Sequence, residues 1–230
     1  MRYEFRVRGR INQKIKIDTQ QEKIAILYRE DKAAAGLLMK KAVSSGSSVI
    51  LYGNDTSFYQ FIHECEPPIV HTVDSKRIYE ELRVPFLMNS AQNTQLTLRE
   101  HYVEYMYQGK YEYFVNRNGV QLPDPSRYLS YYQIKAGNTQ KERFITESFL
   151  LNIISQAMYG NPIHEVSIFL ADPFKPITKV MMRFLEEAPL SVNLIVLYKD
   201  CNHGSEKYGV YSDSNGIYIQ QNRRKYEVIE

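Results

Sequence analysis

Hydrophobic and polar side chains alternate at the start of the chain. In residues 2–8 every second side chain is apolar and most of the others are charged, and residues 13–18 repeat this pattern. A period of two places successive side chains on opposite faces of a sheet, so both segments are predicted to be half-buried strands. Gly9-Arg10 between them favours a turn, and we expect the two strands to pair.

The segments that follow predict strands alternating with helices. Residues 23–28 are mostly apolar, as expected of a strand buried on both faces. Residues 32–44 carry Ala and Leu at helical spacing, and Asp31 can cap this helix. The remaining elements of a βββαβαβ order are a strand at 48–52, a helix at 56–65 and a strand at 69–73.

A polar segment at 89–97 predicts a linker, after which the pattern restarts. Residues 98–107 fit either a helix or a strand. The later elements are strands at 110–116, 120–122 and 127–136, a helix at about 139–159, a strand at 165–171, a helix near 176–187, a strand at 192–198 and a hairpin within 207–229. The predicted fold is therefore α/β, with a basic half at 1–90 and a Tyr-rich half at 98–230 that ends in the hairpin.

Each half contains a βαβ unit. The first has strands at 23–28 and 48–52, and the second has strands at 165–171 and 192–198. A short helical crossover favours a neighbouring parallel strand, so we expect each pair to be adjacent and parallel. The similarity reflects either an internal duplication or the general habit of α/β proteins to repeat βαβ units.

Composition narrows the class of protein. Of 230 residues, 43% are hydrophobic and 24% are charged, which excludes a chain that is disordered throughout. Two cysteines are too few for a disulfide framework, and no apolar run approaches the roughly 20 residues of a membrane span. The first residues lack the apolar core of a signal peptide. We expect a cytoplasmic protein with no membrane partner.

One motif suggests a specific chemistry. Asp124 follows Pro123, and Gln133-x-Lys135 lies near the end of the next predicted strand. This pattern resembles the PD-(D/E)XK nuclease family, in the variant where Gln replaces the second acid, as in Mrr-like restriction nucleases and some transposon end-cleaving subunits. The resemblance covers about 98–198 and implies a restriction-endonuclease-like αβββαβ core for the C-terminal half.

The resemblance also implies a Mg²⁺-dependent endonuclease. Asp124 and Gln133 would be the metal ligands, Lys135 would stabilise developing charge beside the attacking water, and Glu104 or Glu100 would add an acid. Residues two apart on a strand point to the same side, which brings Gln133 and Lys135 together. In the alternative interpretation Asp124 caps a turn and Lys135 is a solvated strand end.

The first two predicted strands carry an excess of cations on their outward side. This surface either binds nucleic acid phosphates or is a solvated sheet face whose edge is protected by charge. A smaller basic cluster, Arg223-Arg224-Lys225, lies near the end of the chain. The candidate nucleic-acid-binding residues of the first cluster are Arg6, Arg8, Lys14 and Lys16.

The chain has 19 Tyr and no Trp, and many of the Tyr lie on predicted strands between 98 and 136. They either stack on nucleobases, line a protein interface or pack within the sheet. No nucleotide-binding glycine motif is present, and Gly53-Asn54-Asp55 is either a turn or a ligand loop.

Two functions follow from these patterns. The first is a metal-dependent, nuclease-like DNA-processing protein. The alternative is a non-catalytic α/β subunit of a nucleoprotein or protein assembly, which uses its basic and Tyr-rich faces to bind nucleic acid, a protein partner or a second copy of itself.

Overall fold

The computed structural model describes a sheet, two helices and a separate hairpin. The described residues are 2–9, 13–18, 24–28, 32–65, 70–74, 129–139, 163–171, 192–198 and 208–229, with Glu142, Thr146 and Leu150. The predicted linker at 89–97 and the elements between 98 and 122 lie outside them. So do the helix at 176–187 and most of the helix at 139–159.

A 9-stranded sheet forms the centre of the structure, in the order β11-β10-β9-β3-β8-β7-β4-β6-β5. Neighbours from β9 to β5 run parallel, and β9, β10 and β11 are joined antiparallel. The prediction of a mixed α/β fold with an antiparallel extension is confirmed. The strands are β3 (Ile24–Tyr28), β4 (Ser48–Gly53), β5 (Val70–Val73), β6 (Tyr131–Lys135), β7 (Val166–Leu170), β8 (Val192–Tyr198), β9 (Tyr208–Asp213), β10 (Gly216–Gln221) and β11 (Arg224–Glu227).

One of the two predicted pairs of neighbouring parallel strands is confirmed. β7 and β8 are adjacent and parallel, as expected. The expectation that β3 and β4 are adjacent is wrong, because β8 and β7 lie between them. Every residue of β7 is buried, and such a strand needs neighbours on both edges and cover on both faces. The two βαβ units therefore differ in strand order, and strands from both predicted halves share one sheet.

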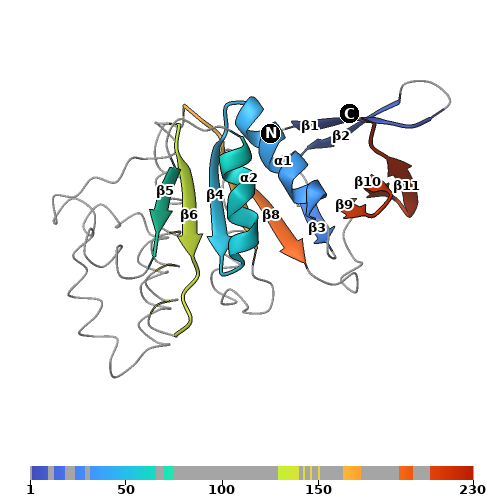
Figure 1. The fold of residues 1–230 in the computed structure, drawn as a ribbon. Helices are drawn as coiled ribbons and strands as arrows, with labels where there is room; N and C mark the ends of the chain where they lie inside the picture. The colour runs from blue at the N-terminus through green and yellow to red at the C-terminus, as the bar shows by residue number, and fades with distance from the viewer. Residues whose placement is uncertain are drawn as a thin grey trace.

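Helices α1 (Ala33–Ser44) and α2 (Tyr59–Glu64) cover one face of the sheet, with the short 3₁₀ helix η1 (Thr56–Phe58) leading into α2 (Figure 1). The helix predicted at 32–44 is confirmed. Its N-cap is Lys32, which makes no side-chain cap, and Asp31 lies outside the described residues. The helix ends at Ser44, and the φ of 77° at Gly46 lets the amides of Gly46 and Ser47 bond back to the carbonyls of Val43 and Ala42.

The predicted strand pair at the start of the chain is a hairpin of β1 (Arg2–Val7) and β2 (Gln13–Asp18). Its alternating apolar side chains are buried in the same core as α1. Lys41 of α1 donates a hydrogen bond to the Glu4 carbonyl at 2.9 Å, and its ammonium lies 5.0 Å from the centre of the Phe5 ring. The buried hairpin residues are Tyr3, Phe5, Val7, Ile15 and Ile17.

The hairpin is also joined to the last described residues. Val7 forms an antiparallel bridge with Val228. On either side of it the Arg8 amide donates to the Glu227 carbonyl at 2.8 Å, and the Ile229 amide donates to the Arg6 carbonyl at 3.0 Å. Residues 227–229 thus link the hairpin to the edge of the large sheet.

The end of the chain holds one strand more than predicted. The turn at Asp213–Gly216 joins β9 to β10 as expected, but a second turn at Asn222 and Arg223 adds β11. The predicted single hairpin at 207–229 is therefore a three-stranded meander.

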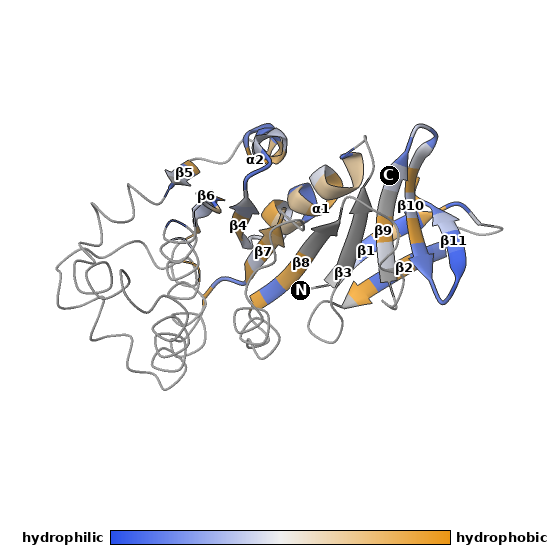
Figure 2. Cartoon of the chain, turned by 90° about the horizontal axis from the view of Figure 1, so that it is seen from below, coloured by the Kyte–Doolittle hydropathy of each residue, from blue (hydrophilic) through white to orange (hydrophobic). Residues whose placement is uncertain are grey.

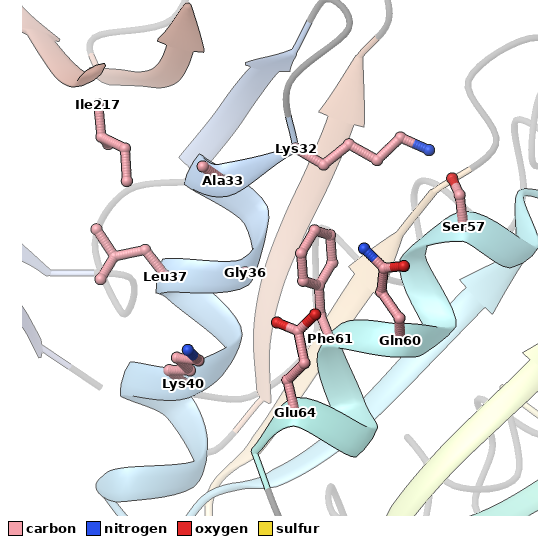
Figure 3. A pocket seen from close by; sticks show the side chains of 10 residues that line it. All are labelled: Lys32, Ala33, Gly36, Leu37, Lys40, Ser57, Gln60, Phe61, Glu64 and Ile217. Carbon is pink, nitrogen blue, oxygen red and sulfur yellow. The ribbon is translucent and has the colours of Figure 1, made fainter. Parts of the chain in front are cut away.

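A groove of about 720 Å³ runs between α1 and α2 (Figure 3). Gly36 of α1 and Phe61 of α2 form its floor, and Leu37 faces Ile217 at one end. A Cβ on Gly36 would lie 2.8 Å from Cδ1 of Phe61, so the two helices approach closely only because residue 36 is glycine.

We predict that Gly36→Ala lowers the free energy of unfolding by about 1 kcal/mol, because the clash with the Phe61 ring exceeds the gain in helix propensity. Urea denaturation followed by circular dichroism measures this. In a Phe61→Leu background the same substitution should be neutral or stabilising. Equal losses in both backgrounds would show that the ring does not limit the approach of the helices.

Candidate functional site

The carboxyl ends of β4 and β7 form a topological switch point. These strands are neighbours, and the chain leaves β4 toward β5 but leaves β7 toward β8, in the opposite direction across the sheet. Open α/β sheets bind ligands outside the carboxyl ends of strands at such a point. We therefore take this edge as the candidate ligand site of the sheet.

Asn54 connects the strand exits at this edge. Its Nδ2 donates to the Gly137 carbonyl at 3.3 Å and to Oδ1 of Asn138 at 3.4 Å, which ties the exit of β4 to that of β6. Gly137 has a φ of 80°, so glycine allows the turn that presents its carbonyl. Oδ1 of Asn54 is buried and has no hydrogen-bond partner among the described residues.

Asp55 lies next to Asn54 and is the best-defined charge at this edge. Oδ1 accepts hydrogen bonds from the amide and hydroxyl of Ser57, and Oδ2 lies 3.1 Å from the Lys32 ammonium. Burial alone would raise the pKa of Asp55, but the hydrogen bonds from Ser57 and Lys32 outweigh it and hold the pKa below its ordinary value. Asp55 is therefore ionised at neutral pH and caps η1.

A second carboxylate lies on the segment that follows β6. Glu142 accepts from the amides of Asn138 and Thr139 at 2.8 and 3.1 Å, and its own amide donates to the Thr139 hydroxyl at 3.2 Å. This reciprocal pattern is a capping box. The two backbone amides lower the pKa of Glu142, so it too is charged at neutral pH.

The predicted ligand Gln133 is part of an internal network. Its side chain is only 3% exposed. The carbonyl oxygen accepts from the Thr72 hydroxyl at 3.2 Å, and the amide nitrogen donates to the Tyr59 carbonyl at 3.4 Å and lies 2.9 Å from Nε2 of His63. Gln133 thus joins β6 to β5 and α2.

Lys135 is exposed at the carboxyl end of β6, on the same side of the strand as Gln133. Asp124, Glu104 and Glu100 lie outside the described residues. Within the described part of the chain, no three His, Cys, Asp or Glu side chains converge as metal ligands would. The Gln133 oxygen is buried and accepts from Thr72, and the predicted ligand Asp124 lies outside the described residues, so the Mg²⁺ site stays a prediction.

The four predicted phosphate-binding cations are all exposed on the β1–β2 hairpin. The register places Arg6 opposite Lys14 and Glu4 opposite Lys16, so these side chains share the outward face. We call this surface the hairpin face; it consists of Glu4, Arg6, Arg8, Lys14, Lys16 and Glu227.

Ion pairs neutralise part of the hairpin face. Glu4 pairs with Lys14 and, at 3.6 Å, with Lys16, and the hydrogen bond from Lys14 lowers the pKa of Glu4. Arg8 pairs with Glu227 at 2.9 Å. No ion pair of Arg6 is found among the described residues. Four cations against two acids leave the face positive.

Two of the Tyr residues have a structural role. Tyr131 and Tyr132 of β6 are 2% and 1% exposed, and the Tyr132 ring stacks on His71 with centroids 4.9 Å apart. For these two, packing within the sheet is correct and stacking on nucleobases is not. The Tyr residues predicted on strands before residue 129 lie outside the described part of the chain.

Two features at the carboxyl ends of the strands were not predicted from the sequence: the capping box of Thr139 and Glu142, and the pairing of Lys32 with Asp55. The capping box could have been found, because Thr139 and Glu142 have the spacing of that motif. Lys32 gives no such signal, since its partner Asp55 lies beyond a helix and a strand.

Comparisons of the chain with family models, with curated proteins and with solved structures find no match. In the part of the chain that the structure describes, no helix has the length and apolar character needed to cross a membrane.

We predict that Asp55→Asn costs about 1 kcal/mol of stability at pH 7, through loss of the pairing with Lys32. The pKa of Asp55 is lowered on folding, so this stabilisation is present above the unfolded value of about 3.9 and is lost as pH falls through the folded value. Urea denaturation of both proteins between pH 7 and pH 3 should show the difference fade.

Asp213→Asn is the matched control. Asp213 also accepts from a backbone amide two residues on and pairs with a lysine, but the Lys225 partner is more exposed than Lys32. Its substitution should cost less. A difference for Asp55→Asn that is the same at pH 3 as at pH 7 would contradict a role for the charge.

Proposed function

We propose that the chain is a non-catalytic, nucleic-acid-binding subunit of a nucleoprotein assembly and that it contacts the phosphate backbone through the hairpin face. The observation that carries the proposal is the pairing of Arg6 with Lys14 across the register, with both side chains exposed outward. Opposite residues on paired strands lie about 5 Å apart and residues two apart on one strand about 7 Å apart. The cations therefore form a dense patch.

A polyanion gains from this arrangement in a way that small anions do not. Each bound phosphate releases condensed counterions, and several neighbouring cations add their effects along one backbone. The acids Glu4 and Glu227 form ion pairs with three of the cations on the face. The apolar side of the hairpin is anchored in the core, so the patch is presented on a rigid element.

We predict that Arg6→Gln and Lys14→Gln each weaken binding to a fluorescein-labelled DNA duplex and each reduce the slope of log affinity against log salt by roughly one. The combined variant with Arg8→Gln and Lys16→Gln should lose most binding. Fluorescence anisotropy across a salt series measures both quantities, and the loss should be similar for unrelated duplex sequences.

Lys40→Gln is the control for each single variant, because it removes one exposed positive charge from α1 rather than from the hairpin. It should change neither quantity. Wild-type protein that fails to bind at low salt, or a fourfold variant that binds like wild type, would refute the proposal.

A second proposal is a nuclease with a restriction-endonuclease-like C-terminal half. It is favoured by the exposed Lys135, which shares one side of β6 with Gln133 and lies at the sheet edge beside the exit of β4. In this proposal Asp124 and Glu104 supply the acids, Lys135 stabilises developing charge, and Gln133 positions β6 through its contacts with Thr72 and Tyr59.

We predict for this second function that plasmid DNA is cleaved in the presence of Mg²⁺ or Mn²⁺ and that a chelator stops cleavage. Asp124→Asn and Lys135→Ala should each abolish or greatly slow it while the melting temperature stays near that of wild type. Gel electrophoresis of the plasmid gives the readout. Cleavage that persists in both variants would come from a contaminant or another site, and no cleavage by wild type would leave the first proposal alone.

A further inference from the structure

The turn between β10 and β11 has an unfavourable backbone conformation. Asn222 has a φ of 50° and Arg223 a φ of 66°, so both residues of this two-residue turn are left-handed. Such turns favour Asn followed by Gly. Asn222 fits the first position, but at the second position Arg223 carries a Cβ that a left-handed backbone disfavours.

The arginine side chains at and beside this turn face solvent. Arg223 and Arg224 are exposed, and among the described residues neither has an ion-pair partner. The next cation differs: the Lys225 ammonium lies 3.6 Å from the Tyr218 ring centre and 3.6 Å from an Asp213 oxygen. An exposed residue that keeps an unfavourable backbone conformation is a candidate for a function outside the fold.

The short strand β11 joins this turn to the bridge with the β1–β2 hairpin. Val7 pairs with Val228 in antiparallel fashion, so the step from Val7 to Arg8 matches the step from Val228 to Glu227. From Glu227, strand β11 runs back along the chain to Arg224, which follows Arg223. Strand β11 is hydrophilic along its length (Figure 2), and a depression of about 360 Å³ lies beside the turn, bordered in part by Arg224 and Tyr226.

We propose that the β10–β11 turn is a second contact with the nucleic acid backbone, in which Arg223 binds a phosphate. The inference rests on the proposed function of the hairpin face and extends the binding surface from β1 to the tip of β11. The left-handed backbone at Arg223 is then maintained for binding at the expense of stability. A second polyanion contact of this kind needs a ligand long enough to reach both elements, such as a nucleic acid duplex.

Arg223→Gly separates binding from stability. Glycine suits the second position of this turn, so the melting temperature should rise by about 2–4 °C. Affinity for the labelled DNA duplex should nevertheless fall several-fold, and the salt slope should flatten by roughly one. Arg223→Lys keeps both the charge and the left-handed backbone, and it should retain most of the affinity with no rise in melting temperature.

The outcomes distinguish the two proposals. Loss of affinity in Arg223→Gly together with a more stable fold supports the turn as a contact. Unchanged affinity in Arg223→Gly, while Arg6→Gln and Lys14→Gln weaken binding, overturns the role of Arg223 and leaves the hairpin face intact. Wild-type protein that does not bind the duplex overturns both.

Discussion

The packing of the β1–β2 hairpin over α1 is the interaction on which the rest of the structure depends. Helix α1 buries Ala34, Ala35, Leu38, Met39 and Ala42 in a core to which both the large sheet and the hairpin contribute. The hairpin supplies the second surface with fully buried aromatic and branched side chains, each worth about 1.5–3 kcal/mol of burial. Residues 227–229 then fix the hairpin to β10, so sheet, helix and hairpin enclose one core.

This arrangement separates stability from recognition. The inward residues of β1 and β2 hold α1, and the outward residues carry charge without entering the core. At the carboxyl ends of the sheet strands, by contrast, polar side chains form hydrogen bonds within the structure. Gln133 uses its amide to hold β5 and α2, and Asn54 joins the exits of β4 and β6. At this edge the two amides therefore join neighbouring elements of the sheet and its covering helix.

Local patterns predicted which residues are buried better than which strands are neighbours. The alternation in residues 2–8 identified β1 and its inward face, and the apolar run at 192–198 matched β8. The prediction that β3 and β4 are adjacent was wrong, because a run of apolar residues indicates a central strand but does not indicate which strand lies beside it.

The candidate site was predictable to a similar extent. The pattern Gln133-x-Lys135 is the same for a ligand pair and for a strand whose Gln bonds to the core. The contacts of Gln133 with Thr72 and Tyr59 come from distant parts of the chain, and no local spacing indicates them. The cationic side of the hairpin could be predicted from the alternation of polar and apolar residues alone. In the structure all four of its predicted cations are exposed.

The pairing of β3 has a consequence for synthesis of the chain. Its two neighbours, β8 and β9, come from residues 192–213, whereas β3 itself ends at Tyr28. A growing polypeptide therefore contains an apolar strand with both edges unpaired until most of the sequence has left the ribosome. Contacts this distant in sequence form slowly, and unpaired edges promote association between chains. Fragments that stop before β8 are therefore expected to aggregate rather than to fold as smaller versions of the protein.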